Sequence, residues 1–114
     1  MEQIEITILR SLVNNEDYAR KVIPFLQPEY FEDRIQKTIF LETSEFIIKY
    51  DSLISLEALQ IEISNRSDLT GEDLQEAKNC IDKLEEKEVD QKWLTDSTEK
   101  WCRDRAIYLA LMES

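Results

Sequence analysis

Carboxylates between positions 85 and 90 are the densest group of side chains with potential chemistry. Glu85, Glu86, Glu88 and Asp90 lie close together in the sequence, and carboxylate oxygens are the ligands that divalent cations prefer. A calcium loop, however, alternates its oxygen ligands around a central Gly, and this segment contains neither feature. We therefore interpret this cluster, and the smaller one at 68–73, as solvated acidic surface.

Other chemistry is limited by the residue types that the chain lacks. It has no histidine and one glycine, which excludes histidine-based catalysis and metal sites and a Gly-rich phosphate loop of the usual kind. Cys80 and Cys102 have no second pair, so we expect buried free thiols in a reducing cytosol and no zinc site. The sequence predicts no catalytic, cofactor-binding or metal-binding residue in this chain.

Glycine and proline are scarce throughout. The 114 residues include one Gly and two Pro, whereas 42% are hydrophobic and 34% are charged. Few β-rich folds could use this composition, because their turns demand Gly. The composition therefore predicts a single all-α domain.

The formal net charge is −11, and residues 57–90 hold 11 acidic and 4 basic side chains. Such a chain repels phosphate backbones, so we expect no tight direct binding of DNA or RNA. Acidic helical faces that keep a small protein soluble are the plain explanation. The alternative is an acidic phage protein that mimics DNA or inhibits a host enzyme, but residues 57–90 follow an ordinary amphipathic pattern.

No apolar stretch of the sequence approaches the length of a membrane span. The N-terminus also lacks a basic region before an apolar run, as a signal peptide would have. We expect a cytoplasmic location and no membrane partner.

Periodic apolar residues divide the chain into helices. The expected helices cover 2–13, 16–26, 33–50, 56–64, Thr70 to about Glu86, and a last helix from Asp90. Four of these helices have a clear inner face. We expect it to hold Ile4, Ile8, Leu9, Leu12 and Val13 in 2–13; Ile35, Ile39, Phe40, Thr43, Phe46, Ile47 and Tyr50 in 33–50; Leu56, Leu59 and Ile63 in 56–64; and Leu74, Ala77, Ile81 and Leu84 in the helix that begins at Thr70. The widest stripe, on 33–50, predicts a central helix packed on more than one side.

The segment 24–33 is rich in aromatic residues and poor in helix formers. Pro24 should kink or end the second helix, and Pro28 suits the first turn of a short helix. Phe25, Tyr30 and Phe31 are therefore either core residues contributed by a loop or a surface on which a partner docks.

The last helix becomes more apolar toward its end. One face carries Leu94, Thr98, Trp101, Arg105, Tyr108 and Met112 at spacings of three and four, and Ile107, Ala110 and Leu111 add a second apolar face. The closing IYLALMES has no capping Gly or polar stop. We expect this helix to be cut short or to need a partner.

Self-association is the role that we predict for this helix. The candidate residues are Trp101, Tyr108, Leu109, Leu111 and Met112, because they are too many apolar groups for one exposed terminal helix. In the alternative, Leu94 and Trp101 belong to the core, and only residues beyond Ile107 contact a partner.

Four stretches, in this order and spacing, resemble a known family. They are EITILRSLVNNEDYARKVIPFL at 5–26, PEYFEDRIQKTIF at 28–40, ISLEAL at 54–59, and a final set comprising Trp93-Leu94, Thr98-Glu99-Lys100, Arg105-Ala106 and Ala110. Together they resemble the N-terminal domain of DnaB-type hexameric replicative helicases, most closely the T-even phage members that work in the primosome.

This resemblance implies a compact head of about five to six helices over 1–104, with a helical hairpin beginning at 105–114. The RecA-like motor of the family, with its Walker motifs, lies outside this sequence, and we expect a longer phage-encoded protein in the bacterial cytoplasm. ATP and Mg would be used in that motor by an ATP-dependent 5'-3' DNA helicase. A stand-alone helical adaptor is the alternative if the natural protein ends at Ser114.

The resemblance also implies partners. N-terminal domains of this family pair through their hairpins and form a collar on the hexamer, above the motor ring. Primase docks on that collar, and helicase loaders contact the helicase at sites that vary. We therefore expect a non-catalytic domain that serves in self-assembly and in docking of primase, with a loader as a further candidate partner.

Overall fold

Two short helices begin the fold in the computed structural model, which describes residues 3–113. α1 (Ile4–Asn14) buries Ile8, Leu9 and Leu12 completely. α2 (Glu16–Val22) follows at once, because the Asn15 side chain accepts a hydrogen bond from the amide of Tyr18 and caps it. The predicted helix 16–26 ends early. A 3₁₀ turn, η1 (Ile23–Phe25), replaces its last turn, since Pro24 has no amide donor.

The aromatic segment continues through a second 3₁₀ turn, η2 (Pro28–Tyr30), with Pro28 in its first turn as predicted. Phe31 follows with no exposed surface. Its ring lies 5.2 Å from that of Phe40 and 5.0 Å from that of Trp101. Phe31 therefore joins α3 and α6 in the core.

α3 (Arg34–Tyr50) is the central helix. Asp33 caps it by accepting hydrogen bonds from the amides of Ile35 and Gln36, and Asp51 ends it in the left-handed conformation at φ 55°. It packs against α1, α4, α5 and η2, which confirms the prediction from its wide stripe. The apolar pattern predicts Tyr50 on that buried stripe, but Tyr50 is 56% exposed in the last turn.

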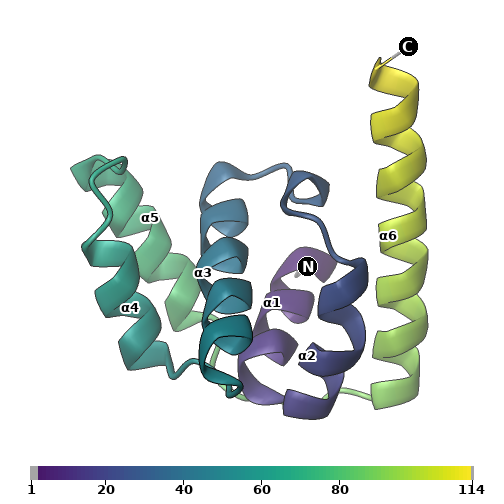
Figure 1. Cartoon of the computed structure of the whole chain (residues 1–114), viewed down its shortest axis with the longest axis horizontal. Helices are drawn as coiled ribbons and strands as arrows, with labels where there is room; N and C mark the ends of the chain where they lie inside the picture. Colours follow the sequence, from purple (N-terminus) through teal and green to yellow (C-terminus); the bar gives the residue numbers. More distant parts are fainter. Residues whose placement is uncertain (1–2, 114) are drawn as a thin grey trace.

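α4 (Leu56–Ser64) and α5 (Gly71–Asp82) form an antiparallel pair on one side of α3 (Figure 1). Ser55 caps α4, and the predicted capping box of α5 is present, since Thr70 and Asp73 each bond the other's backbone amide. Of the apolar residues predicted for these two helices, Leu56 and Leu74 are only partly buried.

α5 ends at Asp82 and not near Glu86 as predicted. Side chains from α1 hold the segment that follows it. Arg10 donates two hydrogen bonds to the carbonyl oxygen of Lys83, at 2.9 and 2.8 Å, and Asn14 donates one to that of Leu84 at 2.8 Å. These carbonyls face α1, so the chain leaves the helix while Leu84 still reaches the core.

α6 (Gln91–Glu113) closes the structure and begins at the predicted cap, where Asp90 accepts a hydrogen bond from the amide of Trp93 at 2.8 Å. Its first half lies against α1, α2 and η2. Its second half extends beyond the other helices (Figure 1). All regular structure in residues 3–113 is helical, as predicted, and none of these helices is long and apolar enough to cross a bilayer.

Candidate interaction surfaces

A buried hydrogen bond fixes the first half of α6 to the head. The hydroxyl groups of Tyr18 and Thr98 lie 2.7 Å apart, and Thr98 is 1% exposed. Burial raises the pKa of Tyr18 above its ordinary value, because the phenolate would lose its hydration there. The pair therefore stays uncharged at neutral pH and satisfies two buried hydroxyls at once.

Trp101 and Arg105 complete this attachment. The Trp101 ring lies edge-on to Tyr30 at 6.0 Å and packs on Phe31, so half-buried Trp101 belongs mainly to the core of the head. This placement matches the alternative given for it above. Arg105 donates from Nε to the carbonyl oxygen of Tyr30 at 2.7 Å and pairs with Glu32 at 3.1 Å.

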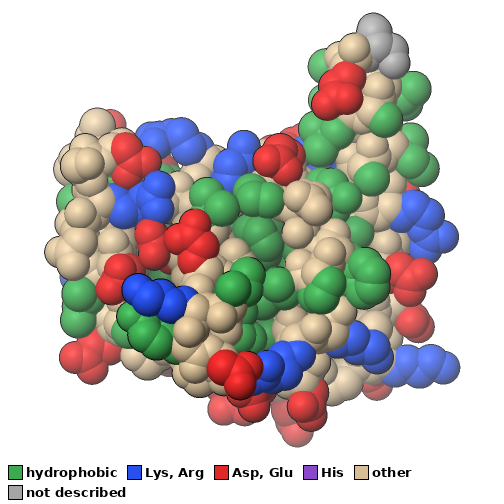
Figure 2. Space-filling view, in the orientation of Figure 1, with side chains coloured by type: hydrophobic (Ala, Val, Ile, Leu, Met, Phe, Trp, Pro, Cys, Tyr) green, Lys and Arg blue, Asp and Glu red, His purple; other side chains and the backbone are tan. Residues whose placement is uncertain are grey.

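Beyond Arg105 the apolar side chains of α6 face solvent. The exposed fractions are 55% for Ile107, 46% for Tyr108, 70% for Leu111 and 67% for Met112. Their spacing places these four residues, which we call the α6 strip, on one side of the helix. Figure 2 shows hydrophobic side chains along this projecting end. Among the self-association candidates, the structure thus brings Tyr108, Leu111 and Met112 together, whereas Leu109 is half-buried.

A second apolar surface lies where α2 and η1 meet α6. This groove, of about 530 Å³, is lined by Lys21, Val22, Phe25, Tyr30, Thr95, Thr98, Glu99, Cys102, Arg103 and Ala106. Phe25 is 69% exposed at its edge, and Tyr30 is half-buried. Phe31, the third docking candidate, has no exposed surface. The docking prediction therefore rests on Phe25 and Tyr30.

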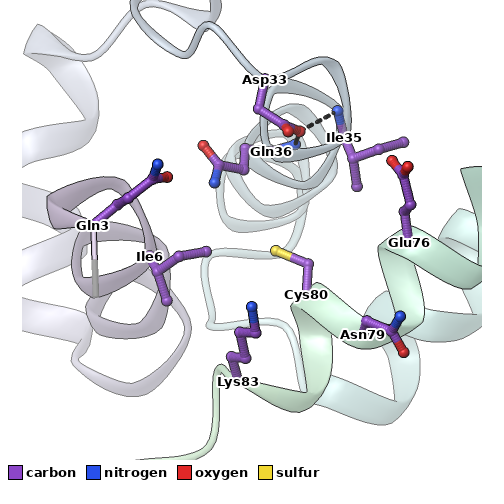
Figure 3. A pocket seen from close by; sticks show the side chains of 9 residues that line it. All are labelled: Gln3, Ile6, Asp33, Ile35, Gln36, Glu76, Asn79, Cys80 and Lys83. Atoms are coloured by element: carbon purple, nitrogen blue, oxygen red, sulfur yellow. Dashed lines mark hydrogen bonds between the residues drawn. The ribbon is translucent and has the colours of Figure 1, made fainter. Parts of the chain in front are cut away.

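A third, more polar pocket of about 590 Å³ lies between α1, α3 and α5 (Figure 3). Its lining residues are Gln3, Ile6, Asp33, Ile35, Gln36, Glu76, Asn79, Cys80 and Lys83. Gln36 is only 8% exposed. Sequence reasoning missed this pocket. The signal that could have revealed it is a glutamine directly after Ile35, on the buried side of α3.

The two cysteines lie in different pockets, Cys80 in the polar one and Cys102 in the apolar groove. Both are free thiols. Burial raises the pKa of each to about 11, so both are protonated and weakly nucleophilic at neutral pH. In residues 3–113 no three side chains of Cys, Asp or Glu lie close enough together to hold a metal ion.

Comparison with known proteins gives a relative for this fold. No family model matches the chain. The chain is 33% identical over 103 residues to the "DnaB-like replicative helicase" of Enterobacteria phage T4. The chain is thus similar to part of a DnaB-like replicative helicase. The match covers 90% of this chain and confirms the predicted resemblance.

The chain spans 22% of the length of this helicase relative. A compact all-α unit of that share is consistent with the N-terminal domain that the sequence resembles. The similarity to a DnaB-like helicase also supports the helicase interpretation over the DNA-mimic alternative.

Proposed function

We propose that this chain is a non-catalytic N-terminal domain of a phage replicative DNA helicase. Its role in the proposal is to assemble the helicase hexamer and to offer a docking surface to primase or to a helicase loader. ATP and Mg would serve an ATP-dependent motor elsewhere in the whole protein, in the cytoplasm of the bacterial host. The observation that carries the proposal is the α6 strip, because no part of the head covers its four apolar side chains in the described structure.

The strip has the form expected of a helix-pairing surface. Residues at positions i, i+1, i+4 and i+5 of a helix form a band that a second helix can cover along its length. The strip begins two residues after Arg105, whose bonds to the head hold the base of the projecting segment in place. A second copy can therefore approach it without disturbing the core.

The energetics favour weak pairing of isolated chains. Full burial of a large apolar side chain contributes about 1.5–3 kcal/mol, so the exposed parts of four side chains from each of two copies offer roughly 6–12 kcal/mol. Association itself costs about 4–15 kcal/mol in lost freedom. The two terms are of similar size, so we expect isolated chains to pair weakly, at about 0.1 to 1 mM, and a larger ring to strengthen this pairing because it raises the effective concentration.

The apolar groove at Phe25 supports the docking half of the proposal. It combines an exposed aromatic side chain with an apolar floor, as grooves that accept an amphipathic helix do. Lys21 and Arg103 outnumber Glu99 in its lining, which leaves an excess of one positive charge there within a chain of net charge −11. An apolar segment with acidic flanking residues, carried by primase or a loader, is the partner expected there.

Sedimentation equilibrium tests the pairing half. We expect the wild-type chain to form dimers at concentrations from about 0.1 to 1 mM, and Leu111→Glu to remain monomeric there because it places a charge in the strip. Ile61→Glu is the matched control, since Ile61 is 53% exposed on α4, away from α6. A wild-type chain that stays monomeric at 1 mM, or an Ile61→Glu variant that is equally monomeric, would contradict the proposal.

A further inference from the structure

Three helices contribute to the polar pocket, and its chemistry is mixed. α1 supplies Ile6, and Gln3 lies just before that helix; α3 supplies Ile35 and Gln36, with Asp33 as its cap; α5 supplies Glu76, Asn79 and Cys80, with Lys83 just after it (Figure 3). Ile6, Ile35 and Cys80 form apolar walls, and the other groups offer hydrogen-bond donors and acceptors. The volume, about 590 Å³, is in the range of ligand sites.

Gln36 is the observation that points to a ligand. It is more than nine-tenths buried and lines the pocket, and Figure 3 shows its amide directed from α3 toward α1. Among residues 3–113 its side chain makes no hydrogen bond, and its amide atoms keep contact with the open pocket, since they are not among the fully buried unpaired atoms. Buried amides in proteins are nearly always paired, by protein, water or ligand. This amide is therefore free to bond a molecule that enters the pocket.

Two carboxylates add further hydrogen-bond acceptors to the polar pocket. Asp33 uses Oδ1 to cap α3, which leaves its second oxygen for other donors. Glu76, exposed on α5, makes no hydrogen bond or ion pair among the described residues and lines the same pocket. Lys83 is the one basic lining residue, so the pocket carries an excess of one negative charge and favours a cation.

We propose that this pocket binds an arginine side chain presented by a partner protein. A guanidinium group has five donors in a fixed plane and can bond a carboxylate and an amide oxygen at once. Here it bonds Asp33 and the Gln36 oxygen, with Glu76 at the rim. The aliphatic part of the arginine lies against Ile6 and Ile35.

Lys83 and Asn79 extend the site beyond the guanidinium. The lysine ammonium donates to a backbone carbonyl of the segment that carries the arginine, and the Asn79 amide offers both a donor and an acceptor to that backbone. Both residues line the pocket. The proposal is independent of the proposed function, because none of the lining residues belongs to α6 or to the groove at Phe25.

The test is titration of the ¹⁵N-labelled chain with the capped tripeptide Gly-Arg-Gly, followed by NMR. We expect saturable shifts of the backbone amides of Gln36, Asn79 and Cys80, with Kd of about 1 mM for a single side chain. The same tripeptide with citrulline in place of arginine, which keeps the shape and loses the charge, should bind about tenfold more weakly. Shifts that do not saturate, or equal binding of both peptides, overturn the proposal.

Single substitutions in the pocket test which residues contact the arginine side chain. Glu76→Gln removes an exposed charge, so the fold is kept, and Gln36→Leu removes the unpaired amide. Each substitution should weaken the binding of the arginine peptide about threefold to tenfold. Glu72→Gln is the matched control, one turn earlier on α5 and outside the pocket. Unchanged affinity in Glu76→Gln overturns the proposal, as does an equal loss in Glu72→Gln, which would indicate attraction by net charge alone.

Discussion

Arg105 donates a hydrogen bond from Nε to the carbonyl oxygen of Tyr30 at 2.7 Å, and this bond joins α6 to a turn 75 residues earlier in the chain. Its Nη1 also reaches Glu32 at 3.1 Å. The Arg105 side chain is 15% exposed, and its guanidinium lies 4.9 Å from the centre of the Tyr108 ring. Arg105 thus links the head to the first residues of the α6 strip.

Replacement of Arg105 should loosen α6. Arg105→Ala leaves the Tyr30 carbonyl oxygen without its partner, and we expect a loss of about 1–3 kcal/mol in the free energy of unfolding. Amide hydrogen exchange in the second half of α6 should become faster. Urea unfolding and exchange followed by NMR measure the two effects.

Arg103→Ala is the control for this experiment, because Arg103 is exposed and its ion pair with Glu99 is long, at 3.9 Å. We expect its effect to remain within about 0.5 kcal/mol. Equal effects of the two substitutions would show that Arg105 acts only through its charge.

The Tyr18–Thr98 hydroxyl pair should behave as a coupled unit. Tyr18→Phe leaves the buried Thr98 hydroxyl unpaired, and Thr98→Val does the same to Tyr18, so each single change should cost about 1–3 kcal/mol. The double variant should cost less than the sum of the two. A double-mutant cycle from urea unfolding measures the coupling, and strictly additive costs would contradict the hydrogen bond.

High pH offers a second test of Tyr18. Burial raises the pKa of Tyr18 above its ordinary value of 10.0, so above that value the unfolded state loses its proton before the folded state does. The stabilising contribution is therefore complete below pH 10 and declines as the pH rises. We expect the melting temperature of Tyr18→Phe to fall less than that of the wild type between pH 9 and 11.

The sequence predicted those features that depend on local chemistry. The Thr70 and Asp73 capping box needs only residues three positions apart, and Asp performs the role usually given to Glu. Pro24 ends α2 because a missing amide donor acts within one turn. The all-α fold and the central position of α3 followed from composition and from the width of one apolar stripe.

The sequence pattern could not predict features that depend on contacts between residues far apart in the chain. Leu84 continues the helical spacing of α5, so the sequence pattern predicts a longer helix. In the structure α5 ends at Asp82, and Arg10 and Asn14 of α1 bond the carbonyl oxygens of the two residues that follow. Phe25 and Phe31 both lie in an aperiodic segment, where no repeat indicates which ring faces the core. Only the packed structure separates the exposed ring from the buried one.

Acid should weaken the capping box of α5. The hydrogen bond from Arg34, together with those at Thr70, lowers the pKa of Asp73 to about 2. Its unfolded-state pKa is the ordinary 3.8, so the contribution to stability is present above that value and is lost as the pH falls toward 2. Asp73→Asn should therefore flatten the dependence of the melting temperature on pH between 5 and 2, which thermal unfolding followed by circular dichroism measures.

The two phenylalanines of the aromatic segment should differ in how much their replacement destabilises the fold. Phe31→Ala opens a cavity between α3 and α6 and should lower the free energy of unfolding by about 3–5 kcal/mol. Phe25 is 69% exposed, so Phe25→Ser should change the free energy of unfolding by less than about 0.5 kcal/mol. Urea unfolding measures both. If Phe25→Ser is as destabilising as Phe31→Ala, Phe25 serves the core, and the groove at α2, η1 and α6 loses the exposed ring on which its docking role depends.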